Sequence, residues 1–349
     1  MNEIPNISDV LMQLLVGNDL DAVQVRAVMA GVLDGAATSA QIAAFAVLLR
    51  AKGETTNELA TLARTMLEYA DTLPLASDGS SDNLIDTCGT GGDRSHSFNI
   101  STVSAIVAAG AGAKVAKHGN RAASSACGSA DVLEQLGIAI ELGPEGVAQC
   151  IEEVGIGFCF APRFHSAMRF AGPTRKELGI PTTFNFLGPL ANPAHVKRQV
   201  IGVSDPSMAD RIIGALAELG ATRAMVVFGH DGLDELTTTD VSTIRELRDG
   251  KITRQVLEPL NLGLPRAAAQ DLRGGTATDN AAIVQRVLAG ESGPQRDIVL
   301  LNTAAALVVA DIATDFADGV LRASEAIDSG SAASVLDRWI TTSNVAAGS

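Results

Sequence analysis

The chain has 349 residues, of which 46% are hydrophobic and 19% charged, with 34 glycines and 12 prolines. These proportions exclude a disordered chain, a coiled coil and a collagen, and they suffice for one large domain or two unequal ones. The 26 Lys and Arg against 40 Asp and Glu give a formal charge of -14. Such acidity disfavours binding of nucleic acid or of an anionic membrane through the overall field, so we expect any anionic ligand to be held by a local basic site.

The sequence has no feature of an exported or membrane-spanning protein. The first ten residues lack a cationic stretch followed by an apolar one, and the longest apolar run, 42–49, is too short to span a bilayer. The four cysteines are too far apart for a CxxC pair, which favours reduced, buried thiols over disulfides or a zinc site. We therefore expect a soluble cytoplasmic protein.

The first seventy residues are predicted to be entirely helical. Ser8 is the candidate cap of a first helix, and residues 21–33 place apolar side chains at helical spacing. Thr38, or the serine after it, starts a third helix, and Thr55 begins a fourth with a capping box. The polar segment 75–83, rich in Ser and Asp, follows, and we interpret it as a domain linker.

Beyond this linker, short apolar runs alternate with helical segments, which is typical of a mostly parallel sheet covered by helices. The predicted strands cover 84–88, 113–116, 156–160, 200–203 and 224–228, and the predicted helices start near 99, near 129 and at 207. Residues 242–258 indicate a β-hairpin that turns at Asp249 and Gly250, and the last sixty residues form Ala-rich helices. The predicted fold class is α/β, with a small all-helical domain and a larger domain whose mostly parallel central sheet is flanked by helices.

The segment 88–102, CGTGGDRSHSFNIST, has three glycines within four positions directly after a predicted strand. Glycines let a backbone approach a ligand closely, and the free amides at the start of a helix attract phosphate. Ser97, Asn99, Ser101 and Thr102 are more polar groups than capping needs, so we favour a phosphate site over a tight turn with ordinary caps. The pattern is neither GxGxxG nor GxxxxGK[ST], which excludes the common dinucleotide and P-loop interpretations.

The next segment, 114–121, concentrates positive charge in an acidic chain. It contains Lys114, Lys117 and Arg121 together with His118, and small residues follow it. This pattern favours an anion site over a solvated basic turn. Whether His118 is structural or catalytic stays open at this point.

Adjacent carboxylates mark a third segment, 230–239, again after a predicted buried strand. Asp234 and Glu235 lie on its loop, and oxygen ligands near phosphates suit Mg²⁺. The alternative is an ordinary solvated pair of surface carboxylates.

A fourth segment, 169–193, begins with Arg169, Arg175 and Lys176 on a predicted helix and continues as a loop rich in Pro, Gly and Asn, which we expect to be irregular. Arg175 is a candidate to hold a carboxylate, and surface ion pairing is the alternative.

Taken together, these segments resemble the anthranilate phosphoribosyltransferase family. Four groups of residues occur in the family's order and spacing, and the resemblance covers essentially the whole chain. They are GTGGD at 89–93, KHGNR at 117–121 followed by SS and GSADVLE, RKELG with FNFLGPLANP, and DEL at 234–236. The resemblance implies transfer of the phosphoribosyl group of phosphoribosyl pyrophosphate (PRPP) to the amine of anthranilate, the second step of tryptophan synthesis. It also implies two Mg²⁺ ions and a homodimer that associates through the helical domain.

The resemblance further implies a division of the chain and a set of ligand contacts. The helical domain would comprise 1–75 with about 165–178, and the α/β domain 80–164 and 179–349. The implied PRPP contacts are Gly89, Gly92, Asp93, Ser97, Asn99, Ile100, Ser101, Thr102, Lys117, His118, Gly119, Asn120, Arg121, Ala122, Ala123, Ser124, Ser125 and Ser129. The implied anthranilate contacts are Gly89, Asn120 and Arg175, and the implied metal ligands are Ser101, Asp234 and Glu235. No residue is assigned as catalytic, although His118 is a candidate, and Arg94 stands where the family often has another glycine.

Two other functions remain as alternatives. A pyrimidine nucleoside phosphorylase shares the general architecture, but it needs a nucleobase pocket and no metal carboxylates, so the GTGGD, KHGN and DE segments argue against it. A nucleic-acid-binding relative without enzymatic activity would need a basic groove, and the net charge of -14 with 3% aromatic residues argues against one.

Overall fold

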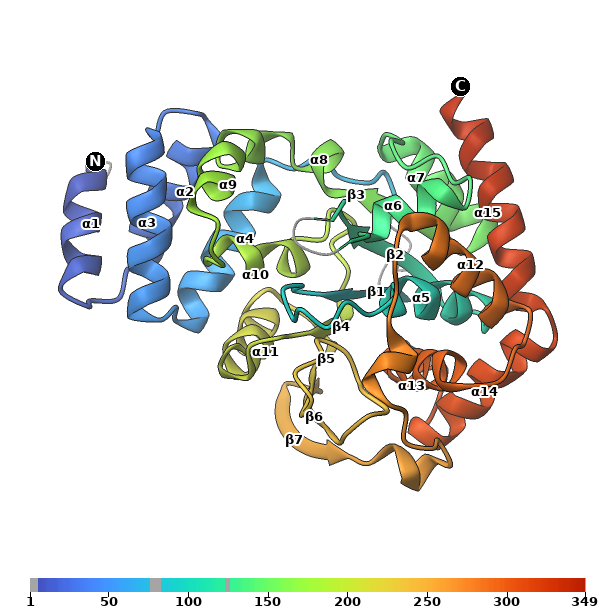
Figure 1. Ribbon diagram of the computed structural model, residues 1–349. Coiled ribbons are helices and arrows are strands. Elements are labelled where there is room, and N and C mark those ends of the chain that lie inside the picture. The colour runs from blue at the N-terminus through green and yellow to red at the C-terminus, as the bar shows by residue number, and fades with distance from the viewer. Residues whose placement is uncertain (1–5, 76–82, 123–125, 349) are drawn as a thin grey trace.

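The computed structural model describes residues 6–75, 83–122 and 126–348 (Figure 1). The interpretation of 75–83 as a linker therefore falls largely outside the described residues, and so do the implied PRPP contacts Ala123, Ser124 and Ser125. No helix in the described ranges is long and apolar enough to cross a membrane.

The amino-terminal part is a bundle of helices, as predicted (Figure 1, blue). The helices are α1 (Ile7–Leu15), α2 (Ala22–Leu33), α3 (Ser39–Lys52) and α4 (Thr56–Glu68). Thr38 and Thr55 form the capping boxes that start α3 and α4. The prediction that Ser8 caps the first helix is wrong, because the Asn6 side chain accepts a hydrogen bond from the Ser8 amide, which lies inside α1. Asparagine is as good an N-cap as serine, and the Asn6 side chain precedes the helix, so its carbonyl oxygen reaches forward to a free amide of the first turn.

The second part is built on a seven-stranded sheet with the order β3-β2-β1-β4-β5-β6-β7. The strands are β1 (Leu84–Gly89), β2 (Lys114–Gly119), β3 (Ile156–Phe160), β4 (Arg198–Gly202), β5 (Arg223–Gly229), β6 (Ser242–Arg248) and β7 (Lys251–Leu257). The first five are parallel, and β6 and β7 form the predicted hairpin. Asp249 and Gly250 both have positive φ, 50° and 72°, as a two-residue turn of this kind requires.

Helices cover both faces of the sheet (Figure 1). The remaining α-helices are α5 (Ile100–Gly110), α6 (Ser129–Gln135), α7 (Pro144–Val154), α8 (Ala161–Phe164), α9 (Gly172–Leu178), α10 (Phe184–Leu190), α11 (Ala209–Glu218), α12 (Ala277–Leu288), α13 (Pro294–Val309), α14 (Phe316–Asp328) and α15 (Ser331–Ala347). Short 3₁₀ turns occur at Ser166–Phe170, Pro206–Met208, Pro259–Leu262 and Ala269–Leu272.

The two faces of the sheet belong to two hydrophobic cores. Val200 and Met225 pack with α5 and α13, whereas Ile201 and Val226 pack with α10, α11 and the amino-terminal helices. Successive residues of a strand point to opposite faces, so strands buried on both faces are apolar at nearly every position. This explains why runs such as 224–228 were recognisable in the sequence.

The segment after Arg175 differs from the prediction, because part of the expected irregular loop is the helix α10. Phe184, Phe186, Leu187 and Leu190 are all buried in the second core. Packing of these side chains decides the conformation here, although Gly188 and Pro189 lower the intrinsic helix propensity of the segment.

The strand order predicts where a ligand-binding site lies. From β1 the chain proceeds to β2 and β3 on one side, and it then returns to place β4 on the other side of β1. In open α/β sheets, ligands bind outside the carboxyl ends of the strands at such a reversal of strand order. The carboxyl ends of β1 and β4 are Gly89 and Gly202, which are directly paired.

Candidate active site

Glycines at the ends of β1 and β4 allow an acidic loop to lie across the edge of the sheet. A Cβ atom at Gly202 would overlap the backbone oxygen of Asp234, and one at Gly89 would overlap its carboxylate. The loop after β5 therefore comes to lie directly on the point where the strand order reverses. Asp234 is buried, so the alternative of an ordinary solvated pair of surface carboxylates is wrong for this residue.

Three carboxylates meet at this edge. Asp234 Oδ2 accepts a hydrogen bond from the Gly91 amide at 2.7 Å. Burial and the nearby Asp93 raise the pKa of Asp234, and burial and Asp234 raise the pKa of Glu235. Asp93 Oδ2 is itself buried and has no hydrogen-bond partner within the described residues. Burial and crowding thus favour the protonated form of Asp234 and Glu235, and a bound cation would favour the ionised form.

This donor set fits Mg²⁺, which prefers carboxylate and hydroxyl oxygens. The Ser101 amide stabilises the Glu235 carboxylate, and the Ser101 hydroxyl lies 3.4 Å from Lys117 Nζ. Within the described ranges, no group of three or more His, Cys, Asp or Glu side chains is arranged to hold a metal ion by itself. Mg²⁺ commonly binds through one or two carboxylates together with water and substrate phosphates, so the arrangement suits a metal that arrives with a phosphorylated ligand.

Lys117 is the cation within this cluster. Its side chain is buried, and Nζ donates to the Thr87 carbonyl at 2.6 Å. Asp86, which is also buried, accepts hydrogen bonds from the His118 amide at 3.1 Å and from Asn192 Nδ2 at 2.8 Å. Asp86 and Asn192 were missed in the sequence because a single polar residue inside an apolar strand, or in a Pro-rich loop, carries no local signature.

The basic segment does not form one basic patch, which corrects the sequence interpretation. Lys114 is the first residue of β2, at the opposite end of the strand from Gly119. The Arg121 guanidinium is exposed and bonded to Glu134 at 2.8 Å and to Asp131 at 3.2 Å. Only Lys117 of the three cations is directed into the cluster.

Two buried histidines pack against each other beside β2. The rings of His118 and His165 are 5.1 Å apart. His118 Nδ1 lies 2.9 Å from the Gly188 carbonyl, and His165 Nε2 lies 2.9 Å from the Ala191 carbonyl. Burial lowers the pKa of His118 to about 4 and that of His165 to about 3. Both rings are therefore neutral at pH 7, each with a hydrogen on the bonded nitrogen.

The glycine loop is held at the start of α5 by residues from the far end of the chain. Asn99 makes no capping bond; its Nδ2 instead donates to the Cys127 carbonyl at 3.2 Å. Asn99 Oδ1 accepts from Asn280 Nδ2 at 2.8 Å, and Ser97 forms a β-bridge with Arg273. Asn280 was missed because nothing in the sequence connects positions that are 181 residues apart.

The tip of this loop has a constrained backbone. Arg94 and His96 have φ values of 59° and 55°, in the left-handed region that side chains other than glycine disfavour. Arg94 stands where the family often has another glycine, and the positive φ explains why a glycine suits this position.

The remaining implied contacts surround the same edge. Gly119, the last residue of β2, lies against Ser129. Ser129 Oγ donates to the Asn120 carbonyl at 3.2 Å, and the Ala122 amide donates to Asp131. Ile100 and Thr102 are buried in the first turn of α5, and Thr102 Oγ1 has no partner in the described chain. Gly92 has a φ of 83°.

Arg175 is available to a ligand. Its half-buried guanidinium lies over the Phe184 ring at 5.8 Å, and burial lowers its pKa. It has no ion pair or side-chain hydrogen bond to any described residue, so the ion-pair interpretation of this arginine is wrong. No hydrogen bond joins Arg175 to Asn120 or Gly89 in the described ranges.

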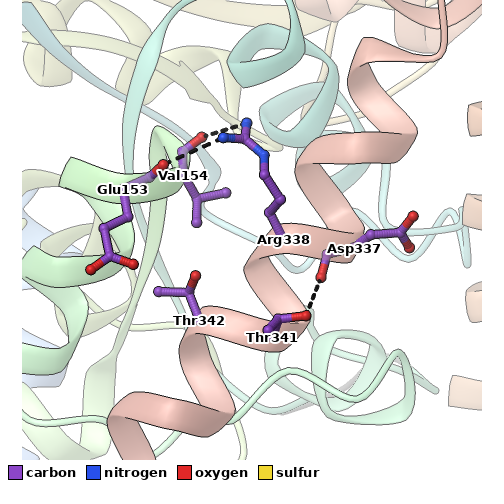
Figure 2. Close-up of a pocket in the computed structure, with 6 residues that line it drawn as sticks. All are labelled: Glu153, Val154, Asp337, Arg338, Thr341 and Thr342. Carbon is purple, nitrogen blue, oxygen red and sulfur yellow. Dashed lines mark hydrogen bonds between the residues drawn. The ribbon is translucent and has the colours of Figure 1, made fainter.

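A surface cavity of about 340 Å³ between α7 and α15 lies outside this site (Figure 2). The Arg338 guanidinium, which lines it, donates to the carbonyls of Glu153 and Val154 at 3.4 and 3.5 Å. These carbonyls end α7, so Arg338 satisfies acceptors that the helix itself leaves free.

The fold and the site define a two-part glycosyl transferase. Residues 81–333 match the model of the glycosyl transferase family, a/b domain, and residues 8–70 match that of the glycosyl transferase family, helical bundle domain. The anthranilate phosphoribosyltransferase of Chloroflexus aggregans is 52% identical over 340 residues, which cover 97% of this chain and 98% of the relative. That of a Nocardioides species is 53% identical over 95% of this chain and 97% of its own length.

Solved structures agree with these relatives. The anthranilate phosphoribosyltransferase of Thermus thermophilus superposes with a TM-score of 0.90 at 41% identity, covering 96% of this chain and 99% of that one. The Saccharomyces cerevisiae enzyme in complex with PRPP and Mg superposes with a TM-score of 0.87 at 28% identity, covering 97% and 98%. The chain belongs to the anthranilate phosphoribosyltransferase family, whose members transfer a phosphoribosyl group to anthranilate. Nothing in the comparisons supports the nucleoside phosphorylase or the nucleic-acid-binding alternative.

Proposed function

We propose that the chain binds PRPP with Mg²⁺ where β1 and β4 end, and that it holds anthranilate beside Arg175 for attack on the ribose. The observation that carries this proposal is the meeting of Asp93, Asp234 and Glu235 with the glycine loop at the start of α5. The Saccharomyces cerevisiae relative was solved in complex with PRPP and Mg, and also in complex with 4-fluoroanthranilate.

The PRPP contacts are those that the resemblance implies, from Gly89 to Ser129. In this arrangement the phosphates lie at the start of α5, where the helix dipole favours negative charge. The amides there also serve protein acceptors, because that of Ser101 stabilises Glu235 and those of Ile100 and Thr102 donate to the Phe98 and Asn99 carbonyls at 2.7 and 3.0 Å. Asn99 acts through its bonds to Cys127 and Asn280, which hold the loop in place. Lys117 supplies the buried positive charge.

The metal ligands are Asp234, Glu235 and Ser101, and we propose two Mg²⁺ ions. When bound, Mg²⁺ neutralises the charge that develops on the departing pyrophosphate. The chain's own carboxylates fix where that charge is neutralised. Their raised pKa values mean that Asp234 and Glu235 give up protons as they become ligands.

The acceptor needs orientation more than activation. The anthranilate amine is neutral at pH 7, so it attacks C1 of the ribose without a strong base, and catalysis rests on positioning and on charge stabilisation. Arg175 holds the carboxylate, for which its unpaired guanidinium is suited. His118 has a pKa lowered to about 4, which makes it a weak base, so its role is in binding.

The test of the reaction follows the fluorescence of anthranilate in a mixture of protein, PRPP and MgCl₂. Loss of fluorescence that requires both PRPP and Mg²⁺ is the expected result. A folded protein that leaves anthranilate unchanged but cleaves uridine or thymidine with phosphate would support the phosphorylase alternative. A mobility shift of DNA or RNA at low salt would support the binding-protein alternative.

We also propose the domain division implied by the resemblance, with a homodimer formed through the helical domain. Met12 and Leu15 of α1, Val16 directly after it and Val23 of α2 are each more than half exposed, and a second copy would cover this apolar surface. The double change Leu15→Glu, Val16→Glu should convert a dimer into a monomer in light scattering after gel filtration. A cytoplasmic location is proposed because the four cysteines are buried as thiols.

A further inference from the structure

Arg50, at the end of α3, connects three segments that are far apart in the sequence. Its Nη2 donates to Asp205 Oδ2 at 2.5 Å, and its Nη1 donates to Glu54 Oε2 at 3.2 Å. The guanidinium also lies 5.0 Å from the centre of the Phe186 ring. A planar guanidinium can serve several partners in fixed directions, which the ammonium of a lysine cannot do.

One branch of these contacts leads to the acceptor side of the site. Glu54, whose side chain is fully buried, accepts a hydrogen bond from Thr183 Oγ1 at 2.5 Å. Thr183 is the residue from which α10 starts. The other end of α10 supplies the Gly188 carbonyl that holds the His118 ring.

The other branch leads to the glycine loop. Asp205 follows Ser204, and Ser204 Oγ donates to the Gly91 carbonyl at 3.0 Å. The Gly91 amide in turn donates to Asp234. Asp205 is fixed independently on its other oxygen, because Oδ1 accepts from the amide and the hydroxyl of Ser207 at 3.0 and 2.7 Å.

We propose that Arg50 is a positioning residue, which sets α10 on the acceptor side and the glycine loop on the PRPP side relative to each other without touching either substrate. The inference rests on the proposed function. Glu54 makes the arrangement sensitive to the loss of Arg50, since Arg50 is the cation bonded to this buried carboxylate. Loss of the Arg50 guanidinium would leave the buried Glu54 carboxylate without this partner, and it would therefore displace both branches at once.

The two branches can be cut separately. Asp205→Asn keeps the Oδ1 acceptor for Ser207 and removes only the charged partner of Arg50. Thr183→Ala removes only the hydroxyl that bonds Glu54. Arg50→Gln removes both connections, and Arg26→Gln is the matched control, because it breaks an exposed pair with Glu68 in the same helical part.

Steady-state kinetics of the full-length variants test the inference. Asp205→Asn should raise KM for PRPP about ten-fold, the size expected for one charge-assisted hydrogen bond, with kcat and KM for anthranilate nearly unchanged. Thr183→Ala should raise KM for anthranilate and leave KM for PRPP unchanged. Arg50→Gln should raise KM for both substrates. Its effect should not add to that of Asp205→Asn when the two changes are combined. The control Arg26→Gln should match the wild type.

The results that would overturn the inference can be told apart from those that would overturn the proposed function. Unchanged KM values in Asp205→Asn and Thr183→Ala, with active wild type, would overturn the inference alone. A fall in kcat with constant KM in these variants indicates loss of folded protein only, and it would overturn the inference too. An inactive wild type would overturn the proposed function and the inference with it. If Arg50→Gln does not fold, the two single-branch variants still decide, since both keep the Glu54–Arg50 pair.

Discussion

The Gly91 amide donates to the Asp234 carboxylate at 2.7 Å, which joins the glycine loop after β1 to the acidic loop after β5. These segments are 143 residues apart, and each carries one half of the proposed binding site. A phosphorylated ligand with Mg²⁺ would compete for the same carboxylate, because the metal and the amide both bind its oxygens. The bond therefore couples the position of the glycine loop to the carboxylate that the metal would bind.

The first prediction concerns the close approach that glycine permits at Gly202. Gly202→Ala places a Cβ against the backbone oxygen of Asp234, which cannot move independently of its loop. We expect activity to fall at least about ten-fold and the free energy of unfolding to fall by about 1–3 kcal/mol, as in other overpacked sites. Urea unfolding and the anthranilate assay measure the two effects.

Gly31→Ala is the control for this change. No atom of the described residues lies within 4 Å of a Cβ at Gly31, which is inside α2, so this variant should gain stability by about 0.5–1 kcal/mol. A Gly202→Ala protein with wild-type stability and activity would show that the loop relaxes easily.

The second prediction concerns the dependence of Mg²⁺ activation on pH. The pKa of Asp234 is raised to about 7 and that of Glu235 to about 8, so below these values the carboxyls hold protons that the metal must displace. The Mg²⁺ concentration for half activation should therefore fall as pH rises from 6.5 to 8.5, by up to about ten-fold per proton and pH unit. A constant value over this range would contradict the arrangement of the carboxylates.

The third prediction concerns the buried histidines and acid stability. The folded pKa of His118 is about 4 and that of His165 about 3, below the ordinary value of 6.5, so the unfolded chain binds more protons in this interval. Their contribution to stability is complete above pH 6.5 and declines as the pH falls toward 4 and 3, with a slope of about 1.4 kcal/mol per pH unit for each ring.

Urea unfolding at pH 7.5, 6.0 and 5.0 checks this slope, with His165→Gln as the comparison. Glutamine can still donate to the Ala191 carbonyl but does not titrate, so the variant should lose stability less steeply than the parent. Equal slopes in both proteins would show that His165 is not buried in its neutral form.

The fourth prediction concerns the strained tip of the glycine loop. Arg94→Gly removes a side chain at a φ of 59°, where a left-handed conformation costs a residue with a Cβ about 1–2 kcal/mol. Part of this gain is offset by the greater freedom of glycine in the unfolded chain, so stability should rise by up to about 1 kcal/mol. A variant that is clearly less stable would show that the Arg94 side chain itself holds the loop.

Local signals made much of the fold predictable. Thr38 and Thr55 begin helices through short-range capping, and Asp249 with Gly250 has the backbone freedom that a hairpin turn needs. Strands buried on both faces are continuous apolar runs, which the sequence displays directly. The helix α10 was missed because its stability comes from packing, which residues with weak helix propensity do not reveal.

The candidate site was predictable only where one short segment carries the chemistry. The glycine loop and the Asp234–Glu235 pair are such segments. The bonds from Asn280 to Asn99 and from Asn192 to Asp86 join distant parts of the chain, and no spacing rule predicts them. The charge of Arg121 was counted as part of an anion site, yet the side chain is paired with Glu134, a partner that only the fold brings close.

The measurement that tests the account most directly is a Mg²⁺ titration of anthranilate consumption with Asp234→Ala, Glu235→Ala beside the wild type. The control is Glu152→Ala, Glu153→Ala, which removes the same number of carboxyl groups from an exposed adjacent pair on α7. We predict that kcat/KM falls at least about a hundred-fold at every Mg²⁺ concentration in the first variant, and that the control is unchanged. Normal activity of the Asp234, Glu235 variant across the titration would contradict the proposed metal site.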